Sequence, residues 1–196
     1  METKESYHHG RLREALLEAA LRELEVSGTE GLSLRGLAES LGVSKSAPYR
    51  HFKSKHELLV ALAAEGFRDF ADRLEAAAAL DGAGAFDRLL NVAEGYVDFA
   101  RARPALYRLM FSRFGYSLHS EACKRNSLRT FGGLIAAVGA AQESGWKRER
   151  PRASLSLSIW AAVHGWAGFL IDGLIPEESD FNEESWRGCL RSLIED

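Results

Sequence analysis

The stretch that decides the fold is SLRGLAESLGVSKSAPYRHFKSKHE, residues 33–57. Its first half places apolar side chains at helical spacing, at Leu34, Leu37, Ala38 and Leu41. Ser33 can cap this helix, and Gly42 can end it because glycine tolerates the left-handed conformation. After Val43, Ser44 can cap a second helix that runs to about His51. The pattern predicts a helix, a tight turn and a second short helix.

The charge of this stretch is as informative as its periodicity. No acid occurs between Glu39 and Glu57, whereas four basic residues do: Lys45, Arg50, Lys53 and Lys55. A short basic and polar helix supported by an apolar helix suits the major groove of DNA. Pro48 cannot donate a backbone hydrogen bond, so the second helix is expected to begin irregularly or a residue or two later.

The order of these residues resembles the DNA-binding domain of TetR-family transcriptional regulators. The pattern is L-x-x-L-A-x-x-L-G-V-S-x-x-x-x-Y-x-H-F-x-x-K-x-x-L-L, which runs here from Leu34 to Leu59. The resemblance covers about the first third of the chain. It implies a three-helix helix-turn-helix domain, a homodimer, and a C-terminal domain that binds a small-molecule effector.

The DNA-contacting positions that follow from this reading lie in one segment: Ser33, Arg35, Ser44, Lys45, Ser46, Ala47, Tyr49, Arg50, His51 and Lys55. Arg50 is the best candidate for a guanine edge, because a guanidinium matches the two acceptors of that base. Ser33, Tyr49 and Lys55 are expected to hold phosphates.

The rest of the chain has helical periodicity and no strand pattern. We expect an all-α fold of about nine helices, with a helix-turn-helix domain at 1–55 and an effector-binding and dimerisation domain at 56–196. A polar arm (1–8) and a helix (11–26) precede the motif, and further helices are expected at 54–79, 85–101, 105–111, 120–144, 155–175 and 181–194. The Ser54–Glu57 pair predicts a capping box for the first of these.

The segment 155–175 is long and apolar enough to suggest a membrane span. It contains two serines, His164 and Asp172, and the remaining chain has no other membrane signal. We therefore expect a buried helix. With the last helix it is also expected to form a two-helix seam that pairs with a second copy of the chain.

The run from Trp160 to Trp166 resembles the W-x-x-x-H-G signature of one group of TetR-type C-terminal domains. The family resemblance implies an effector pocket among the middle helices. The candidate lining is Tyr96, Phe99, Tyr107, Met110, Phe111, Phe114, Phe131, Trp160 and His164. Each of these residues, including His164, can instead be a plain core residue, and both interpretations remain open.

Composition limits the other classes of function. The net charge of −3 excludes a generally basic DNA-coating protein, so positive charge must be local. Two cysteines and a polar N-terminus favour a reducing cytoplasm. His119 and Cys123 are four residues apart, but no third ligand or orienting acid accompanies them, so no enzyme activity, cofactor or metal is expected. An activator, or an effector-independent DNA-binding or scaffolding protein, remains the alternative to a ligand-released repressor.

Overall fold

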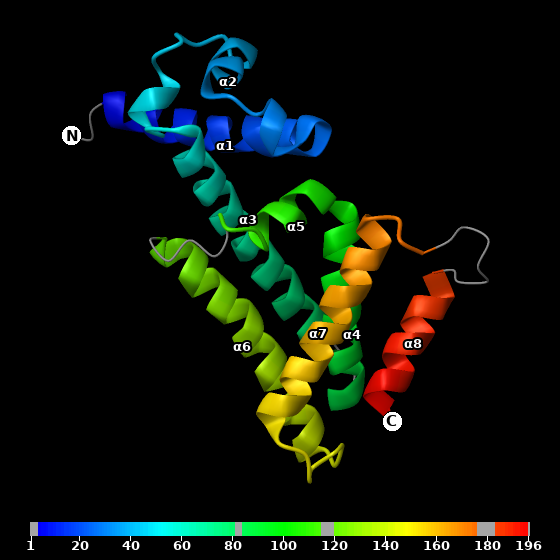
Figure 1. Cartoon of the computed structure of the whole chain (residues 1–196). Coiled ribbons are helices and arrows are strands. Elements are labelled where there is room, and N and C mark those ends of the chain that lie inside the picture. The colour runs from blue at the N-terminus through cyan, green and yellow to red at the C-terminus, as the bar shows by residue number, and fades with distance from the viewer. Residues whose placement is uncertain (1–3, 81–83, 115–119, 176–182, 196) are drawn as a thin grey trace. The chain divides into compact units, whose positions relative to one another are not determined.

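A computed structural model describes residues 4–80, 84–114, 120–175 and 183–195, and these ranges contain helices and no strand (Figure 1). The helices of this part of the chain are α1 (Lys4–Gly31), α2 (Leu34–Ser40), the 3-10 helix η1 (Pro48–Arg50), α3 (Lys55–Ala78), α4 (Ala85–Ala102), α5 (Pro104–Met110), α6 (Glu121–Glu143), α7 (Arg152–Ile171) and α8 (Glu183–Glu195). The expected all-α fold is confirmed.

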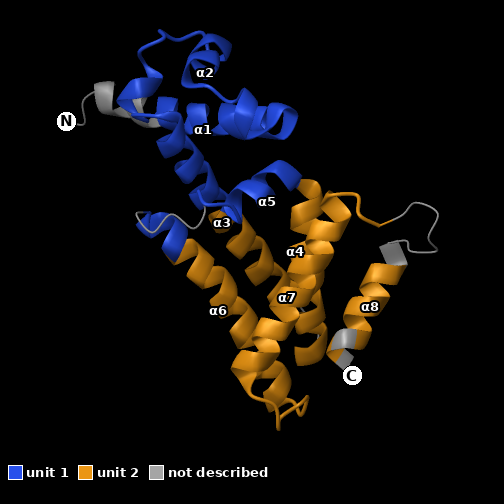
Figure 2. Cartoon of the chain, in the orientation of Figure 1, with its two compact units in different colours: residues 1–66, 103–124 blue, residues 67–102, 125–196 orange. Residues whose placement is uncertain are grey.

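The helices gather into two compact units. Unit 1 comprises residues 1–66 and 103–124, and unit 2 comprises residues 67–102 and 125–196 (Figure 2). The long helix α3 belongs to unit 1 up to Gly66 and to unit 2 from Phe67, while α5 belongs to unit 1. The sequence analysis divided the chain into a DNA-binding domain at 1–55 and an effector-binding domain at 56–196. This division into functional domains remains a prediction.

The core of unit 1 forms where α1 meets the helix-turn-helix segment. The buried face of α1 repeats at helical spacing through Leu16, Ala20 and Leu24, and α2 buries Leu37. Phe52 is 1% exposed, and the guanidinium of Arg13 lies 5.2 Å from its ring centroid. One aromatic ring thus anchors the end of the DNA-reading segment in the unit's core.

The core of unit 2 is built on aromatic contacts between the C-terminal half of α3 and α4. The ring of Phe70 lies 4.8 Å from that of Tyr96 and 4.6 Å from that of Phe99. Helix α4 packs against α7, and α8 packs against both. The ion pairs of Arg187 with Glu94 and Asp98 tie α8 to α4, and the neighbouring Trp186 is buried.

The N-terminal helix differs from the expectation. A polar arm was expected over residues 1–8, but α1 begins at Lys4. No proline interrupts the segment, and a single glycine inside a helix costs only about 1 kcal/mol relative to alanine. The predicted break at Ser27–Gly28 does occur: Gly28 has φ 65° and ψ −171°, and it kinks α1 before the helix resumes to Gly31.

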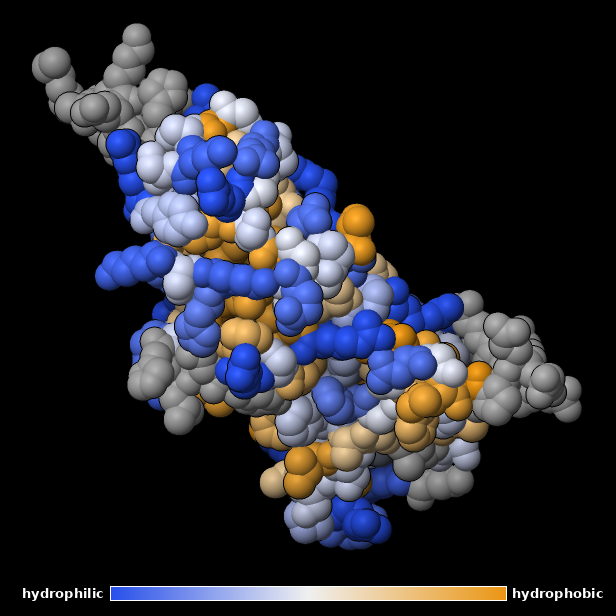
Figure 3. Space-filling model, turned by 45° about the horizontal axis from the view of Figure 1, so that its top comes forward, coloured by the Kyte–Doolittle hydropathy of each residue, from blue (hydrophilic) through white to orange (hydrophobic). Residues whose placement is uncertain are grey.

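Helix α7 also differs, because it is not buried within one chain. Only 22% of its most apolar stretch is buried, and Leu157 and Phe169 are 55% and 49% exposed. Figure 3 shows that hydrophobic residues also lie among the hydrophilic residues on the molecular surface. Among the described residues α7 is the one helix long and apolar enough to cross a membrane, by length and composition only. The sequence predicted burial from hydropathy, which does not reveal what covers a helix.

Candidate DNA-binding and effector sites

The helix-turn-helix begins with the predicted cap. The side chain of Ser33 accepts a hydrogen bond from the backbone N–H of Gly36 at 3.0 Å, which satisfies one of the free donors of α2. Leu34, Leu37 and Ala38 are buried, as their spacing predicted. Gly42 has φ +65°, and the N–H of Val43 then donates to the carbonyl of Ala38 at 3.0 Å.

The second helix of the motif is short and irregular. Ser44 does not cap it: Ala47 occupies the cap position without a side-chain hydrogen bond, and Pro48 is the first residue of η1. Proline fits the first helical position because its missing N–H is not needed there. The expected late start is confirmed, and the end at about His51 agrees with a helix that ends at Arg50 and has His51 as its C-cap, whereas the expected Ser44 cap is wrong.

The predicted DNA-binding residues form an exposed surface around this turn. Seven are exposed, namely Ser33, Arg35, Ser44, Lys45, Ser46, Tyr49 and Arg50, while Ala47, His51 and Lys55 are partly buried. Lys45 lies 3.8 Å from the carboxylate of Glu39, and both side chains are more than 60% exposed. Such a pair contributes little, so Lys45 remains available to a phosphate.

The start of α3 holds this surface in place. The N–H of Glu57 donates to the hydroxyl of Ser54 at 3.2 Å, and the Glu57 carboxylate accepts from the N–H of Lys53 at 2.8 Å. The bond from Glu57 to Ser54 is the predicted cap, whereas the Glu57 carboxylate accepts from Lys53, one residue before the cap residue whose N–H a capping box would use. The ammonium of Lys55 donates to the carbonyl of Glu30 at 3.2 Å, so this predicted phosphate contact also joins α3 to the end of α1.

The candidate effector residues separate into two groups. In unit 2, Trp160 lies 5.5 Å from the Phe131 ring and 6.1 Å from the His164 ring. The indole N–H of Trp160 donates to the hydroxyl of Tyr96 at 3.3 Å, and that hydroxyl lies 2.9 Å from Nδ1 of His164. Burial lowers the pKa of His164, so the ring favours its neutral form. Phe99 joins this group through Phe70.

The other four candidates belong to unit 1. The ring of Tyr107 on α5 lies 4.8 Å from that of Phe111, the residue that follows α5, and Phe114 lies 5.5 Å from the ring of His56. Met110 is fully buried, and a Cβ added at Gly66 would lie 2.7 Å from its sulfur. Here Met110 serves the packing of α5 on α3. Of the His119–Cys123 pair that was considered as a metal or nucleophile site, His119 lies outside the described residues. Cys123 is buried, and burial raises the pKa of its thiol.

Unit 2 also contains a groove that the sequence did not reveal. Its cavity volume is about 330 Å³. Helices α3, α4 and α6 and the residue that follows α3 line it with Ala71, Leu74, Glu75, Ala78, Ala79, Ala85, Arg88, Val92, Arg129, Thr130, Gly133, Ala136, Ala137 and Ala140. None of the nine predicted effector residues is among them. Alanines at helical spacing on α3 and α6 were the available signal, but core faces give the same pattern.

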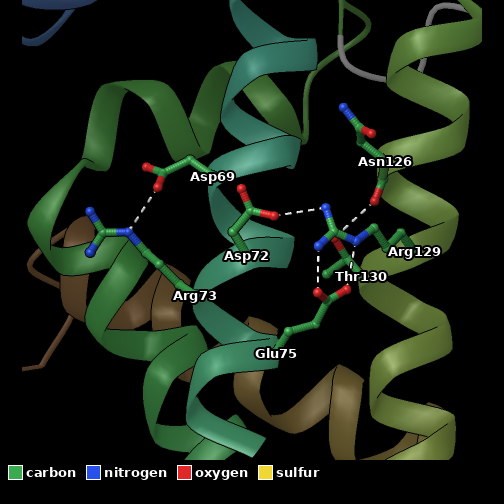
Figure 4. A network of polar contacts seen from close by, with 7 residues as sticks. All are labelled: Asp69, Asp72, Arg73, Glu75, Asn126, Arg129 and Thr130. Atoms are coloured by element: carbon green, nitrogen blue, oxygen red, sulfur yellow. Dashed lines mark hydrogen bonds and ion pairs between the residues drawn. The ribbon is translucent and has the colours of Figure 1, made fainter. Parts of the chain in front are cut away.

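Arg129 bridges two of these helices beside the groove. Figure 4 shows its guanidinium reaching from α6 to two carboxylates of α3. Nη1 lies 2.8 Å from Asp72, and Nε lies 2.6 Å from Glu75, which also accepts a bond from Nη2. The hydrogen bonds to Glu75 and then to Asp72 raise the pKa of Arg129 further. Arg73 pairs instead with Asp69 of its own helix.

Two family patterns match these two parts of the chain. The pattern described as "Bacterial regulatory proteins, tetR family" matches residues 16–62, and "Tetracyclin repressor-like, C-terminal domain" matches residues 89–193. The chain belongs to the TetR family. The first match contains the whole helix-turn-helix, and the second contains the aromatic group of unit 2.

Individual proteins are also similar to this chain. A solved protein of unknown function from Rhodococcus sp. RHA1 is 31% identical, covers 95% of each chain and superposes with a TM-score of 0.82. The HTH-type transcriptional regulator Mb1846 of Mycobacterium bovis is 29% identical over 133 residues, or 66% of this chain and 57% of that protein. The chain thus spans little more than half the length of this relative. The class C tetracycline repressor of Escherichia coli is 55% identical over 51 residues, 26% of this chain and 23% of its own.

Proposed function

We propose that this protein is a sequence-specific DNA-binding regulator, a repressor that a small and mostly apolar ligand releases from its operator. The observation that carries the proposal is the exposed surface around η1, where Tyr49 and Arg50 stand free on a segment anchored by Phe52. The 55% identity with the class C tetracycline repressor over 51 residues supports a DNA-reading role for the N-terminal part. The role is regulatory rather than enzymatic, and the place of action is the cytoplasm.

The working form is a homodimer built on α7 and α8. The outer face of α7 exposes Leu157 and Phe169, and Gly165 and Gly168 have open space around an added Cβ. An apolar face of this kind is stabilised when a symmetry-related copy covers it. Two helices from each copy then form a four-helix bundle, and each dimer presents two η1 segments to half-sites about one DNA turn apart, roughly 34 to 36 Å.

Ligand response is transmitted through α3. This helix runs without a break from Lys55 to Ala78, so it belongs to both units. A ligand held by unit 2 lowers operator affinity only if it binds the released conformation more tightly than the DNA-binding conformation. By linkage, DNA must then weaken ligand binding by the same factor. The C-terminal part is of the W-x-x-x-H-G type, in which Trp160 and His164 share the hydroxyl of Tyr96.

The test is to select DNA sequences from a random pool and measure affinity by fluorescence anisotropy. We expect a two-fold symmetric site, with Arg50→Ala losing discrimination at one base pair in each half. The same affinity for selected and scrambled DNA would refute sequence-specific regulation. Unchanged operator affinity in the presence of a saturating ligand would favour the effector-independent alternative.

A further inference from the structure

We propose that the groove between α3, α4 and α6 binds an amphiphilic anion, an aliphatic chain that ends in a carboxylate. The proposal rests on the proposed function, because it names the class of ligand to which the regulator responds. The groove is separate from the predicted aromatic set, and every residue that lines it lies in unit 2.

The apolar part of the ligand follows from the lining. Seven alanines contribute methyl groups, and the cavity of about 330 Å³ lies at the lower end of the range of ligand pockets. The lining given by the described residues contains no aromatic ring on which a flat ligand would stack. Small side chains on three helices leave a narrow apolar space, which fits a linear aliphatic chain.

The charge of the ligand follows from the ionic groups of the lining: Glu75, Arg88 and Arg129. Glu75 is already engaged, because Arg129 bonds both of its oxygens and also pairs with Asp72. A cationic ligand that paired with Glu75 would have to displace Arg129 from both oxygens of that carboxylate. An anionic ligand finds Arg88, which has no acidic partner within salt-bridge distance in the described part of the chain.

The position of Arg88 matches such a head group. Ala85, Arg88 and Val92 occupy one face of α4 at helical spacing, and all three line the groove. Val92 is buried while Arg88 is exposed, so the face runs from apolar to charged. An arginine stem covers apolar surface while its guanidinium stays at the water boundary. The chain of the ligand lies along the alanines, and its carboxylate pairs with Arg88 at the rim.

The head-group test uses three ligands with one chain: octanoate, octan-1-ol and octyltrimethylammonium. Calorimetric titration into the full-length protein without DNA should rank octanoate first, by about three- to fivefold over the alcohol, since an exposed ion pair contributes modestly. Arg88→Gln should remove this preference. Arg125→Gln, on an exposed position of α6 that does not line the groove, should keep it.

The location test uses two adjacent glycines of α6. A Cβ at Gly132 or at Gly133 meets nothing within 4 Å, so both accept a side chain, but only Gly133 lines the groove. Gly133→Leu should fill the space and weaken octanoate binding by about tenfold or more, since about 1.4 kcal/mol corresponds to a factor of ten. Gly132→Leu should bind octanoate like the wild type.

The outcomes separate the groove from the function. Absence of octanoate binding, equal or tighter binding of the cation, or binding that survives Gly133→Leu overturns the groove proposal. Operator affinity of the ligand-free protein is measured in parallel. If the ligand-free protein binds operator and scrambled DNA equally, the proposed regulatory function is contradicted, but the result for octanoate binding is unaffected. Octanoate binding that is lost in Gly133→Leu and kept in Gly132→Leu supports the groove proposal.

Discussion

The carboxylate of Glu25 on α1 accepts hydrogen bonds from the backbone N–H groups of Ala105 and Leu106, each at 3.1 Å, and so caps α5 from a helix eighty residues away in sequence. The free N–H groups at a helix start favour an acceptor and a negative charge. This contact joins α5 to α1 within the unit that carries the helix-turn-helix.

Removing this cap should destabilise unit 1. Glu25→Ala leaves the start of α5 unsatisfied and should cost about 1 kcal/mol of unfolding free energy, the usual cost of a lost cap. Urea unfolding followed by circular dichroism measures it. Glu18→Ala, at another exposed position of α1, is the matched control. Equal midpoints for the two variants would show that the cap contributes nothing.

Base reading and phosphate binding should respond differently to mutation. Arg50→Ala should reduce discrimination at one base pair per half-site by about 1–3 kcal/mol. Lys55→Ala should weaken binding to all sequences alike and flatten the salt dependence, because a phosphate carries no base information. Affinities for single-base operator variants at several salt concentrations separate the two. A specificity change in Lys55→Ala would reverse the assignment of these roles.

The dimer seam should fail when a charge is placed on α7. Gly168 has open space around an added Cβ, so Gly168→Glu should leave the subunit folded but bury a carboxylate between copies. Sedimentation should report monomers, and operator affinity should fall by about 100-fold or more as bivalent binding is lost. Gly132→Glu, on an equally open position of α6, should remain dimeric. A monomeric wild type at micromolar concentration would refute the seam.

The close approach of α3 and α5 should make Gly66 intolerant of a side chain. A Cβ there would lie 2.7 Å from the sulfur of Met110 and 2.9 Å from Cδ1 of Leu106. Gly66→Ala should therefore destabilise by about 1–3 kcal/mol despite its better helix propensity. Gly132→Ala gains the same propensity in open space and should be stabilising. Thermal unfolding of both variants tests the difference, and a stable Gly66→Ala would mean that α5 yields easily.

His164, whose Nδ1 lies 2.9 Å from the hydroxyl of Tyr96, should make the stability of the protein depend on pH. Burial lowers the pKa of His164 from its ordinary value of 6.5, so the unfolded chain takes up a proton before the folded chain does. The stabilisation is complete above about pH 6.5 and is lost as the pH falls through the lower folded pKa. His164→Gln should have a smaller drop in unfolding midpoint between about pH 7.5 and about pH 5.5. The control is His56→Gln, and an identical drop in both variants would contradict the assignment.

The local signals of the sequence specified most of the helices. Caps and turns act on neighbouring backbone groups, so their positions can be predicted from spacing alone. In the structure, Ser33 and Ser54 accept cap hydrogen bonds, and Gly28 and Gly42 have positive φ angles. The proline at position 48 likewise placed the irregular start of η1. Family membership followed from the same segment, because turn, aromatic and basic positions occur there in one order.

Only the tertiary structure decided which distant groups meet. The cap from Glu25 to α5, the bridge from Arg129 to Asp72 and Glu75, and the alanine-lined groove join segments separated by dozens of residues. Such contacts depend on how helices pack, and periodicity gives the face of a helix without its partner. The same reason explains α7: hydropathy marked it as a helix that avoids water, while only 22% of its most apolar stretch is buried in the fold of one chain.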